Sequence, residues 1–330
     1  MSEREIQLPM LVTGVAGVAG LNAFRHFHNL FPGQVIGVCR EDLWPLHGNG
    51  IIGCDITNGD QLKRLFEEHH FKSVLSCEGT CALKSCEMDP PMAQRVNVGG
   101  VCNLLDAIGQ TDVRMIHLSI DLVFSGDGDG GYVETDTPDP VTVYGKTMVE
   151  AEQEILTRRS DIFVMRISLP MGISYSGHAG AIDWIQSRFK QDKPATLYFD
   201  EVRTPQYTDC MNELFEVLLT NNMSGLYHGG GQTKMSLYEI AQVVNRLGGY
   251  NPDNLQGCPR IEAGPMPPRA GNVTLDTTKL CTELGYQPFS PWPLSDHWFP
   301  TTRQWHYERT EMDEAFGHEF LASVLYHRPG

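Results

Sequence analysis

The residue whose type most directly suggests chemistry is Tyr144, in the segment VTVYGKTMVEAE (141–152). A tyrosine and a lysine four residues apart lie on one face of a helix, where the ammonium group lowers the pKa of the phenol and the pair can transfer a proton. The residue four positions after Tyr144 is Met148, so one member of such a pair is missing. The segment therefore indicates either an enzyme with a rebuilt proton relay or a protein that no longer catalyses.

A second chemical motif is the glycine-rich segment TGVAGVAG (13–20), in which Gly14, Gly17 and Gly20 are spaced three residues apart. It follows a short apolar run and precedes a segment with helical spacing. Glycines at such a turn let a pyrophosphate approach the backbone N–H groups of the helix start, where the helix dipole favours negative charge. The motif predicts dinucleotide binding, and a merely tight strand-to-helix turn is the alternative.

The end of the second expected strand bears on the choice between NAD and NADP. A carboxylate there commonly binds the adenosine ribose of NAD, whereas a cation accommodates the 2′-phosphate of NADP. Arg40 follows Cys39 at this point, so NADP(H) is favoured over NAD(H). Glu41 and Asp42 come next and could also reach the ribose, and a solvated Arg40 is the other alternative.

Short apolar runs rich in β-branched residues alternate with segments of helical spacing along the first half of the chain. Such alternation is typical of a parallel sheet covered on both faces. We therefore expect an α/β fold, a Rossmann-type doubly wound parallel sheet with a smaller C-terminal lobe. The expected strands cover 9–14, 34–39, 73–77, 114–119 and 161–168, and the expected helices cover 19–31, 60–70, 90–109 and 144–156.

The composition changes after residue 170, where Gly and Pro clusters appear. We expect a dinucleotide-binding domain over 8–170, to which 200–225 returns with a helix at 212–220. The segments 171–199 and 226–330 then form the substrate-binding lobe and a C-terminal extension. In that extension the four-residue spacing of three apolar residues predicts an amphipathic helix docked on the body or on a second subunit; the three are Phe316, Phe320 and Val324.

Charge and cysteine content narrow the class of protein. The 330 residues include 25 Lys+Arg and 41 Asp+Glu, a net charge of −16 that repels nucleic acid and anionic lipid. The nine cysteines are scattered, which indicates reduced thiols in the cytoplasm. Cys77, Cys81 and Cys86 cluster but fit no common zinc spacing, so we expect no metal site. No apolar run is long enough to span a membrane.

An ordered set of motifs from about residue 9 to 292 resembles the extended short-chain dehydrogenase/reductases. Within them it is most similar to the branch of dTDP-4-dehydrorhamnose reductase, which also contains the regulatory β subunit of methionine adenosyltransferase. The resemblance implies an NAD(P)-dependent reductase of a nucleotide-activated keto-sugar, and a homodimer. The motifs are TGVAGVAG (13–20), CDIT (54–57), CEMDPPMAQRVNVGGVCNLL (86–105), HLSIDLVFSG (117–126), YVETDTPDPVTVYGKT (132–147), GLYHGGG (225–231) and PPRAGNVTLDTTKLCTELGY (267–286).

The resemblance also implies which residues hold the cofactor. Two would lie at the adenine, three beside the pyrophosphate and ribose, and Asn97 behind the active site. Glu78 is unusual because small residues are common at its position, and its carboxylate would either face away from the phosphates or bind a ribose hydroxyl. Asp55 and Ile56 are the two residues at the adenine, and Cys77, Glu78 and Gly79 are the three beside the pyrophosphate and ribose. The other members of the expected cofactor-binding set are Gly14, Ala16, Gly17, Val18, Gly20, Arg40, Asn97, Tyr144 and Met148.

The catalytic set of the similar enzymes is a Ser or Thr, a Tyr and a Lys. Tyr144 matches, but the other two positions are Ile120 and Met148. Ser119 and Lys146 cannot simply replace them, because adjacent strand residues point to opposite faces and residues two apart on a helix do not share a face.

Two residues near Tyr144 stay candidates for contact with the substrate. A local shift of the loop after the strand could still bring the Ser119 hydroxyl into the site. Asp121, in the same loop, is the better candidate, and both are included with Tyr144 in the expected catalytic set.

The loss of the lysine affects the two directions of a redox reaction differently. An unperturbed tyrosine has a pKa of roughly 10, so about one molecule in a thousand is phenolate at neutral pH, a cost near 4 kcal/mol if Tyr144 must act as a base. Alcohol oxidation should therefore be poor. Carbonyl reduction needs only an acid, and a neutral phenol can still donate its proton.

Arginines in the second half of the chain are candidates for binding the substrate diphosphate. Guanidinium groups bind phosphate oxygens in a bidentate way, and the rest of this acidic chain repels anions. The resemblance places Arg166, Arg203 with Thr204, and Arg269 around the substrate cleft. For each arginine a structural ion pair is the alternative.

Two functions therefore stay open. The first is an NADP(H)-linked reductase of a nucleotide sugar with an atypical active site. The second is a cofactor-binding subunit that regulates or scaffolds a partner without catalysis. Tyr144 and the glycine loop favour the first, and the loss of two catalytic positions favours the second.

Overall fold

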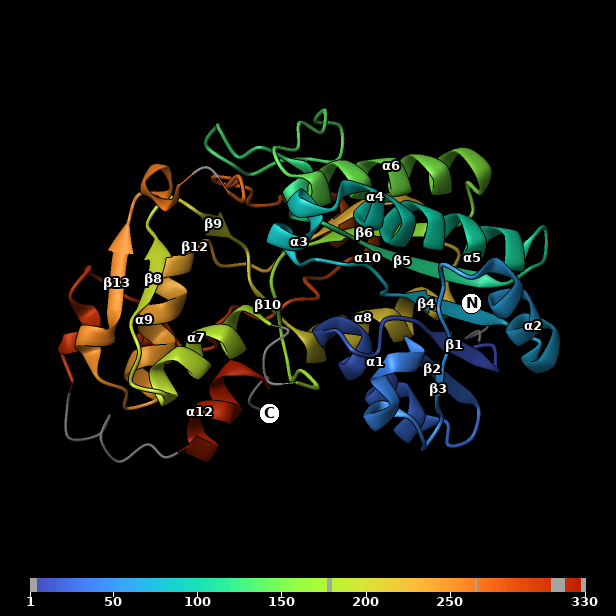
Figure 1. Cartoon of the computed structure of the whole chain (residues 1–330), viewed down its shortest axis with the longest axis horizontal. Helices are drawn as coiled ribbons and strands as arrows, with labels where there is room; N and C mark the ends of the chain where they lie inside the picture. Colours follow the sequence, from blue (N-terminus) through green and yellow to red (C-terminus); the bar gives the residue numbers. More distant parts are fainter. Residues whose placement is uncertain (1–4, 177–179, 265, 310–317, 328–330) are drawn as a thin grey trace.

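The structure is a computed structural model that describes residues 5–176, 180–264, 266–309 and 318–327. Figure 1 shows a larger part built on a parallel sheet and a smaller C-terminal lobe beside it. No helix in these described ranges is both long and apolar enough to cross a membrane.

A seven-stranded sheet with the strand order β11-β6-β5-β4-β1-β2-β3 forms the centre of the larger part. Every neighbouring pair in it is parallel. The predicted Rossmann-type doubly wound parallel sheet is therefore confirmed. Its strands are β1 (Met10–Val12), β2 (Val35–Cys39), β3 (Ile51–Gly53), β4 (Ser73–Ser76), β5 (Arg114–Ile120), β6 (Phe163–Ile167) and β11 (Gly225–Gly229).

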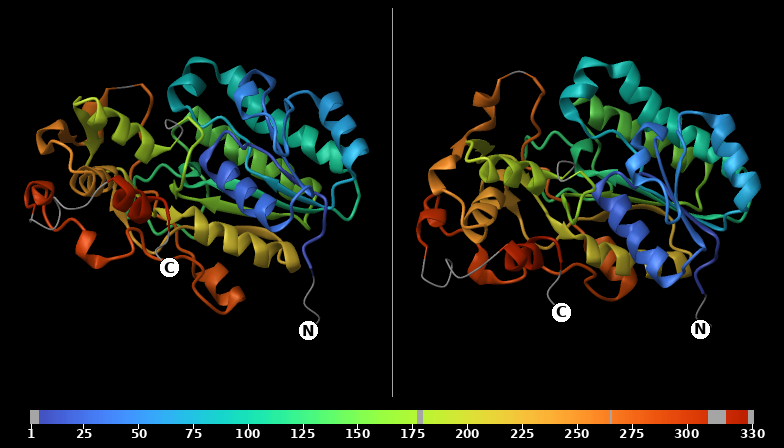
Figure 2. Two further views of the ribbon diagram at one scale, coloured as in Figure 1. Left: turned by 90° about the horizontal axis from the view of Figure 1, so that it is seen from below. Right: turned by 60° about the horizontal axis from the view of Figure 1, so that its bottom comes forward.

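Helices cover both faces of the sheet, as Figures 1 and 2 show from three directions. One face carries α2 (Gly59–His69), α5 (Gly100–Ile108) and α6 (Val143–Arg158), and the other carries α1 (Val18–Leu30) and α8 (Thr208–Thr220). A shorter stretch, α3 (Leu83–Met88), α4 (Pro90–Ala93) and a π-helical turn at Gln94–Gly99, leads into α5.

Alternation along the strands divides the apolar side chains between two cores. Leu11 packs with α2, α5 and α6, whereas its neighbours Met10 and Val12 pack with α1 and α8. All three are fully buried. Burial on both faces explains why these strands read as continuous apolar runs instead of alternating ones.

The C-terminal lobe contains α7 (Ala181–Lys190), β8 (Ala195–Tyr198), α9 (Leu237–Leu247) and β13 (Leu255–Cys258), and β8 pairs with β13 in parallel. Ser236 and Glu239 form a reciprocal capping box at the start of α9. Strand β11 runs to Gly229 and α10 (Thr278–Leu284) packs on it, so the returning segment extends past the expected limit at residue 225.

The helix expected near the C-terminus is α12 (His318–Leu325). It docks on the body, where the Tyr207 hydroxyl donates to the Val324 carbonyl at 2.7 Å and the Trp298 and Phe320 rings meet edge to face. Phe316, the first residue of the predicted spacing, lies outside the described residues.

A buried polar row fastens α6 to the sheet. Ser119 of β5, Arg166 of β6 and His228 of β11 are in register on three adjacent strands. Glu152 of α6 lies over them: its carboxylate accepts from Arg166 at 2.7 and 2.9 Å and from Ser119 Oγ at 2.5 Å. Arg166 also lies 3.3 Å from His228 Nε2. This ion pair sets the position of the helix that carries Tyr144.

We predict that Arg166→Met lowers the free energy of unfolding by about 3–5 kcal/mol, because it leaves the Glu152 carboxylate buried without its partner. Urea denaturation checks this. The double variant Arg166→Met/Glu152→Met should recover most of the loss, since two apolar side chains then replace both charges.

Asp106→Asn is the matched control, because it removes the partner of Arg158 in a much more exposed pair and should cost no more than about 1 kcal/mol. If Arg166→Met costs no more than this control, the ion pair does not fix α6.

Candidate active site

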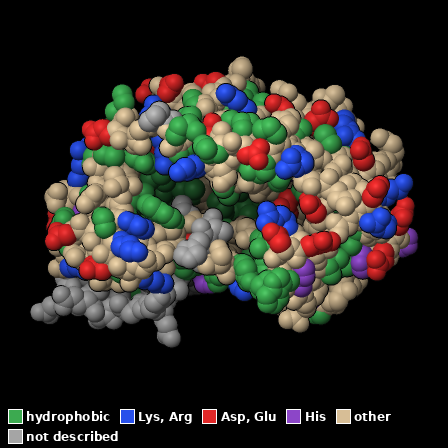
Figure 3. All heavy atoms as spheres, in the orientation of Figure 1, with side chains coloured by type: hydrophobic (Ala, Val, Ile, Leu, Met, Phe, Trp, Pro, Cys, Tyr) green, Lys and Arg blue, Asp and Glu red, His purple; other side chains and the backbone are tan. Residues whose placement is uncertain are grey.

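A cavity of about 390 Å³ lies where the carboxyl ends of β4, β5 and β6 meet the start of α1 and the C-terminal lobe. Figure 3 shows the hollow between the two parts, with hydrophobic side chains on its walls. The expected site residues that line it are Gly17, Val18, Gly20, Cys77, Glu78, Gly79, Ser119, Asp121, Tyr144, Met148, Arg203 and Arg269. Those that do not line it are Gly14, Ala16, Arg40, Asp55, Ile56, Asn97, Arg166 and Thr204.

The glycine loop has the shape that a pyrophosphate needs. Gly14 has φ +69°, and a Cβ there would lie 2.4 Å from the Cys77 carbonyl oxygen, so only glycine fits between β1 and β4. A Cβ on Gly20 would lie 2.2 Å from the Gly14 carbonyl oxygen. Gly17 is different: it caps α1 and faces the cavity, where a Cβ would meet protein atoms no nearer than 3.4 Å. The space beside it is open to a ligand.

Two loops carry the residues expected to contact the adenosine of a dinucleotide. The Arg40 guanidinium is exposed and pairs with Asp42, with Nε 3.0 Å from Oδ1. The Asp55 carboxylate accepts from the Thr57 backbone at 2.9 Å. Ile56 is buried, and its carbonyl accepts from the Asn103 amide. The cation at the end of β2 is therefore accessible but partly neutralised by its neighbour.

Asn97 connects the loop after β4 to the helix of Tyr144. Its Oδ1 accepts from the Thr80 backbone at 2.7 Å, and its Nδ2 donates to Thr147 Oγ1 at 2.8 Å. The Thr147 hydroxyl in turn donates to the Tyr144 carbonyl. Asn97 thus lies behind the cavity wall and acts on Tyr144 through the backbone.

Tyr144 borders the cavity and is 7% exposed. Its hydroxyl makes no hydrogen bond to a residue in the described ranges, so it is available to a ligand. Burial, and then the negative charges that Cys81 and Asp121 can carry, raise the pKa of Tyr144 well above its usual value of 10. Tyr144 is therefore a neutral phenol, which can donate a proton but is a very poor base.

Apolar side chains border the phenol at the two positions where the resemblance would lead us to expect polar ones. Met148, one turn later on α6, is 3% exposed and lines the cavity, and so does Ile120. Lys146 is exposed, in agreement with the expectation that it cannot replace the missing ammonium group.

The polar groups of two expected site residues, Ser119 and Arg166, bind Glu152 of α6. Ser119 borders the cavity, but its hydroxyl donates to Glu152, which argues against a catalytic role. Arg166 lies outside the cavity wall in its ion pair with Glu152, and its guanidinium stacks on Phe124 at 5.1 Å. The expected substrate contact of Arg166 is therefore corrected to a structural one. The physical reason is that its strand position places it on the α6 face of the sheet.

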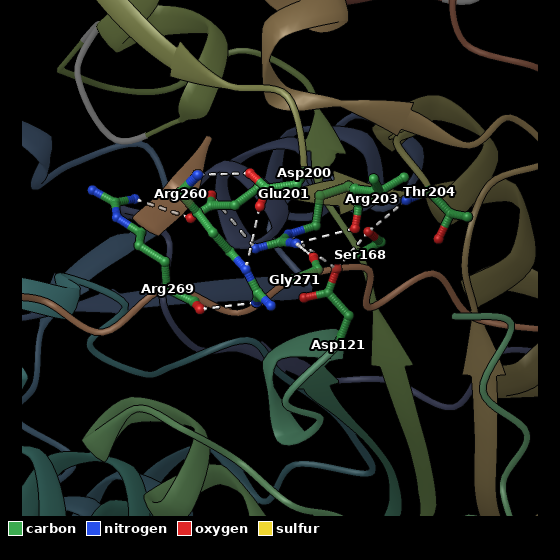
Figure 4. Close-up of polar contacts among 10 residues, drawn as sticks. Asp121, Ser168, Asp200, Glu201, Arg203, Thr204, Arg260, Arg269 and Gly271 are labelled. Carbon is green, nitrogen blue, oxygen red and sulfur yellow. Dashed lines mark hydrogen bonds and ion pairs between the residues drawn. The ribbon is translucent and has the colours of Figure 1, made fainter. Parts of the chain in front are cut away.

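Asp121 and Arg203 meet at the end of the cavity where the resemblance leads us to expect a substrate, which we call the substrate end (Figure 4). Asp121 Oδ2 accepts from Ser168 Oγ at 2.6 Å and lies 3.7 Å from Arg203 Nε. Burial raises the pKa of Asp121 above its usual value, and Arg203 and Ser168 oppose this rise. Thr204 is buried beneath them and donates its backbone N–H to Ser168 Oγ at 3.0 Å.

Glu201 is a site residue that the sequence reasoning missed. Its buried carboxylate lies between two guanidinium groups, 4.0 Å from Arg203 Nη2 and 3.6 Å from Arg269 Nη1 (Figure 4). The available signal was its spacing two residues before Arg203, which puts both side chains on one side of an extended segment. Arg269 stacks on Tyr198 at 4.7 Å, and its Nε donates to none of the described residues.

The charges at the substrate end balance in pairs. Arg203 and Arg269 face Asp121 and Glu201, at distances longer than a direct hydrogen bond. Arg203 Nη1 donates hydrogen bonds to the Val202 and Gly271 carbonyl oxygens. The arrangement can bind a ligand that presents both anionic groups and hydroxyls. The described residues contain no cluster of His, Cys, Asp and Glu suited to a metal ion.

Glu78 brings a carboxylate to the phosphate loop itself. It is partly buried, lines the cavity and accepts a hydrogen bond from the Gly14 backbone. Burial is the main cause that raises the pKa of Glu78 to about 7. Glu78 therefore lies on the wall of the cavity at the glycine loop.

Comparison with known proteins places this architecture in a family. Residues 9–294 match the family model described as the RmlD substrate binding domain. A dTDP-4-dehydrorhamnose reductase of Mycolicibacterium smegmatis is 26% identical over 270 residues, which cover 79% of this chain and 80% of that protein. The β subunit of methionine adenosyltransferase 2 of Danio rerio is 23% identical, over 82% of this chain and 83% of that subunit.

A solved structure has the same fold. The dTDP-4-dehydrorhamnose reductase of Bacillus anthracis, in complex with NADP, matches with a TM-score of 0.73 and 18% identity, over 86% of this chain and 95% of that one. The match of the family model spans most of the chain. The chain therefore belongs to the RmlD substrate binding domain family, and its fold is that of the extended short-chain dehydrogenase/reductases.

Proposed function

We propose that the protein is an NADP(H)-dependent reductase of a nucleotide-activated keto-sugar. The observation that carries the proposal is that the Tyr144 hydroxyl and the glycine loop at Gly17 line one cavity. A proton donor and a site for a dinucleotide thus share one space. When bound, the nicotinamide supplies the hydride, and the names of the reductases similar to this chain support a keto-sugar as the acceptor.

The direction of the reaction follows from the state of the phenol. Tyr144 is neutral because burial and nearby acidic groups oppose its ionisation, and Met148 offers no ammonium group to counter them. A neutral phenol donates a proton to the carbonyl oxygen as that oxygen gains charge. Alcohol oxidation would need the phenolate, so we infer that the enzyme works as a reductase.

The substrate end supports a nucleotide sugar. The free Nε of Arg269 can donate to a diphosphate oxygen, and Asp121 and Glu201 can accept from sugar hydroxyls. Arg203 holds these two carboxylates in place. We further propose a cytoplasmic homodimer through α6, which the family resemblance and the nine free cysteines support.

A second candidate function is a regulatory subunit that binds the cofactor without catalysis. Ile120 and Met148 favour it, because they replace two polar positions beside Tyr144. The similarity to the methionine adenosyltransferase β subunit supports it as well. The two functions differ in one measurable respect, the consumption of NADPH with a keto-sugar.

We predict that Tyr144→Phe lowers turnover about 10²–10⁴-fold on a panel of nucleotide-activated 4-keto-sugars, because the proton donor is lost. NADPH consumption measures the rate. Affinity for NADPH should change by less than about 1 kcal/mol. Tyr286→Phe, at an exposed tyrosine, is the control and should leave the rate unchanged. Equal rates in Tyr144→Phe and wild type would exclude Tyr144 as the acid.

We predict that Met148→Lys raises alcohol oxidation relative to reduction and moves its pH profile to lower pH. The new ammonium group would stabilise the Tyr144 phenolate one turn away. Met88→Lys adds the same charge at an exposed position and should change neither. A folded Met148→Lys variant whose pH profile matches wild type would show that Tyr144 does not set the rate.

We predict that Arg40→Ala weakens NADPH binding about tenfold or more and leaves NADH binding nearly unchanged, since only NADPH presents a 2′-phosphate. Fluorescence titration measures both affinities. Arg64→Ala, on the exposed side of α2, is the control. A parallel loss for both cofactors, or for neither, would assign the preference to another residue.

A further inference from the structure

Glu78 lines the same cavity as Gly17, the residue beside which the proposed function places the pyrophosphate of a dinucleotide. The loop after β4 is held against the glycine loop, because Thr13 Oγ1 accepts from the backbone N–H groups of Cys77 and Glu78 at 3.1 and 3.2 Å. The close approach of Gly14 to Cys77 fixes the same contact. These contacts fix the backbone from which the Glu78 side chain enters the cavity.

The groups that face Glu78 from the surrounding elements do little to neutralise the negative charge of its carboxylate. The Gly14 backbone donates to the carboxylate, Asp55 adds a like charge from the loop after β3, and Arg40 adds the one opposite charge, from the end of β2. Arg40 is already paired with Asp42. The thiols of Cys39, Cys54 and Cys77 are neutral, because burial, with a smaller contribution from Glu78, raises their pKa values to about 11 or 12.

Burial is the first cause of the elevated pKa of Glu78, so the group titrates near neutrality. A pyrophosphate at the start of α1 would oppose the charged form more strongly. It would also compete with the carboxylate for the Gly14 N–H group. The neutral carboxyl group, in contrast, can donate a hydrogen bond to a phosphate or ribose oxygen.

We propose that Glu78 couples cofactor binding to protonation: the dinucleotide binds the form of the protein in which this carboxyl group is neutral, and binding takes up a proton. The inference rests on the proposed function, because it assumes that the glycine loop binds a dinucleotide. The charge of Glu78 then sets how tightly the loop binds its ligand at a given pH.

The coupling has a definite sign. Below about pH 6 the carboxyl group is neutral in the free protein, so affinity does not depend on its titration. Above about pH 7 the free protein must first bind a proton, and affinity should fall by up to about tenfold per pH unit. If the carboxylate instead accepts from a ribose hydroxyl, the charged form binds better and affinity does not fall.

The test is isothermal titration calorimetry of NADPH and NADH at pH 6.0 to 8.5, in buffers of different ionisation enthalpy, on wild type and Glu78→Gln. The 2′-phosphate of NADPH titrates near pH 6 by itself, so the difference between the two proteins is the relevant quantity. We expect wild type to take up close to one proton more than Glu78→Gln at pH 8. Because Gln does not titrate, we expect position 78 to change the affinity of Glu78→Gln by less than about twofold between pH 6.0 and 8.5.

Glu67→Gln, at an exposed carboxylate on α2, is the matched control and should behave as wild type. Equal proton uptake by wild type and Glu78→Gln, or weaker binding by Glu78→Gln at pH 8, would overturn the inference alone. Absence of dinucleotide binding by both proteins at every pH would overturn the proposed function and the inference with it.

Thermal unfolding without ligand gives a second readout. A carboxyl group whose pKa is raised on folding loses stabilising free energy as pH rises from its unfolded value toward its folded value. The melting temperature of wild type should therefore fall relative to Glu78→Gln between about pH 5 and pH 8. Parallel curves for the two proteins would contradict the titration that the inference requires.

Discussion

The ion pair between Glu152 and Arg166 is the contact on which the arrangement of the site depends. It joins α6 to β5, β6 and β11 through side chains that are in register across three strands. Both partners are nearly inaccessible to solvent, so the pair is costly to break and leaves the helix few alternative positions. Tyr144 lies about two helical turns before Glu152 in α6, so the same helix places Tyr144 at the cavity wall. Asn97 then fixes the first turn of α6 against the loop after β4.

The chemistry of the site follows from what surrounds the phenol. Ile120 and Met148 form an apolar wall beside Tyr144, and Asp121 adds negative charge nearby. Both features oppose the phenolate. The cavity makes Tyr144 a poor base and leaves it a neutral proton donor, which favours reduction over oxidation in the reaction proposed above. In the coupling proposed above, the carboxylate of Glu78 opposes an anionic cofactor at the other end of the cavity.

Local sequence patterns predicted most of the fold. The runs around Val12, Val38 and Met165 read as buried strands because both faces of the sheet are covered, and the glycine spacing identified the first turn. Strand β3 was missed because its three residues give no periodic signal. Twelve of the residues expected at the site line one cavity, because the carboxyl ends of parallel strands meet at one edge.

The partners of individual charged groups could not be predicted from sequence. Arg166 and Arg203 have similar local contexts at strand ends, yet one pairs with α6 and the other faces the cavity. The difference depends on which residue of another element lies opposite, and that is a tertiary relation. Glu201 was missed for the same reason, because its importance arises from the approach of Arg269 across the cleft. The orientation of Glu78 toward Gly14 likewise depends on the packing of β4 against the glycine loop.

The most direct test of the account follows the hydride itself. The protein is incubated with NADPH deuterated at C4 of the nicotinamide and with the panel of nucleotide-activated 4-keto-sugars, and the products are analysed by mass spectrometry. The account predicts a reduced sugar that carries one deuterium on the former carbonyl carbon. Binding of NADPH without any labelled product, together with capture of a partner protein that depends on the cofactor, would contradict it and favour the regulatory subunit.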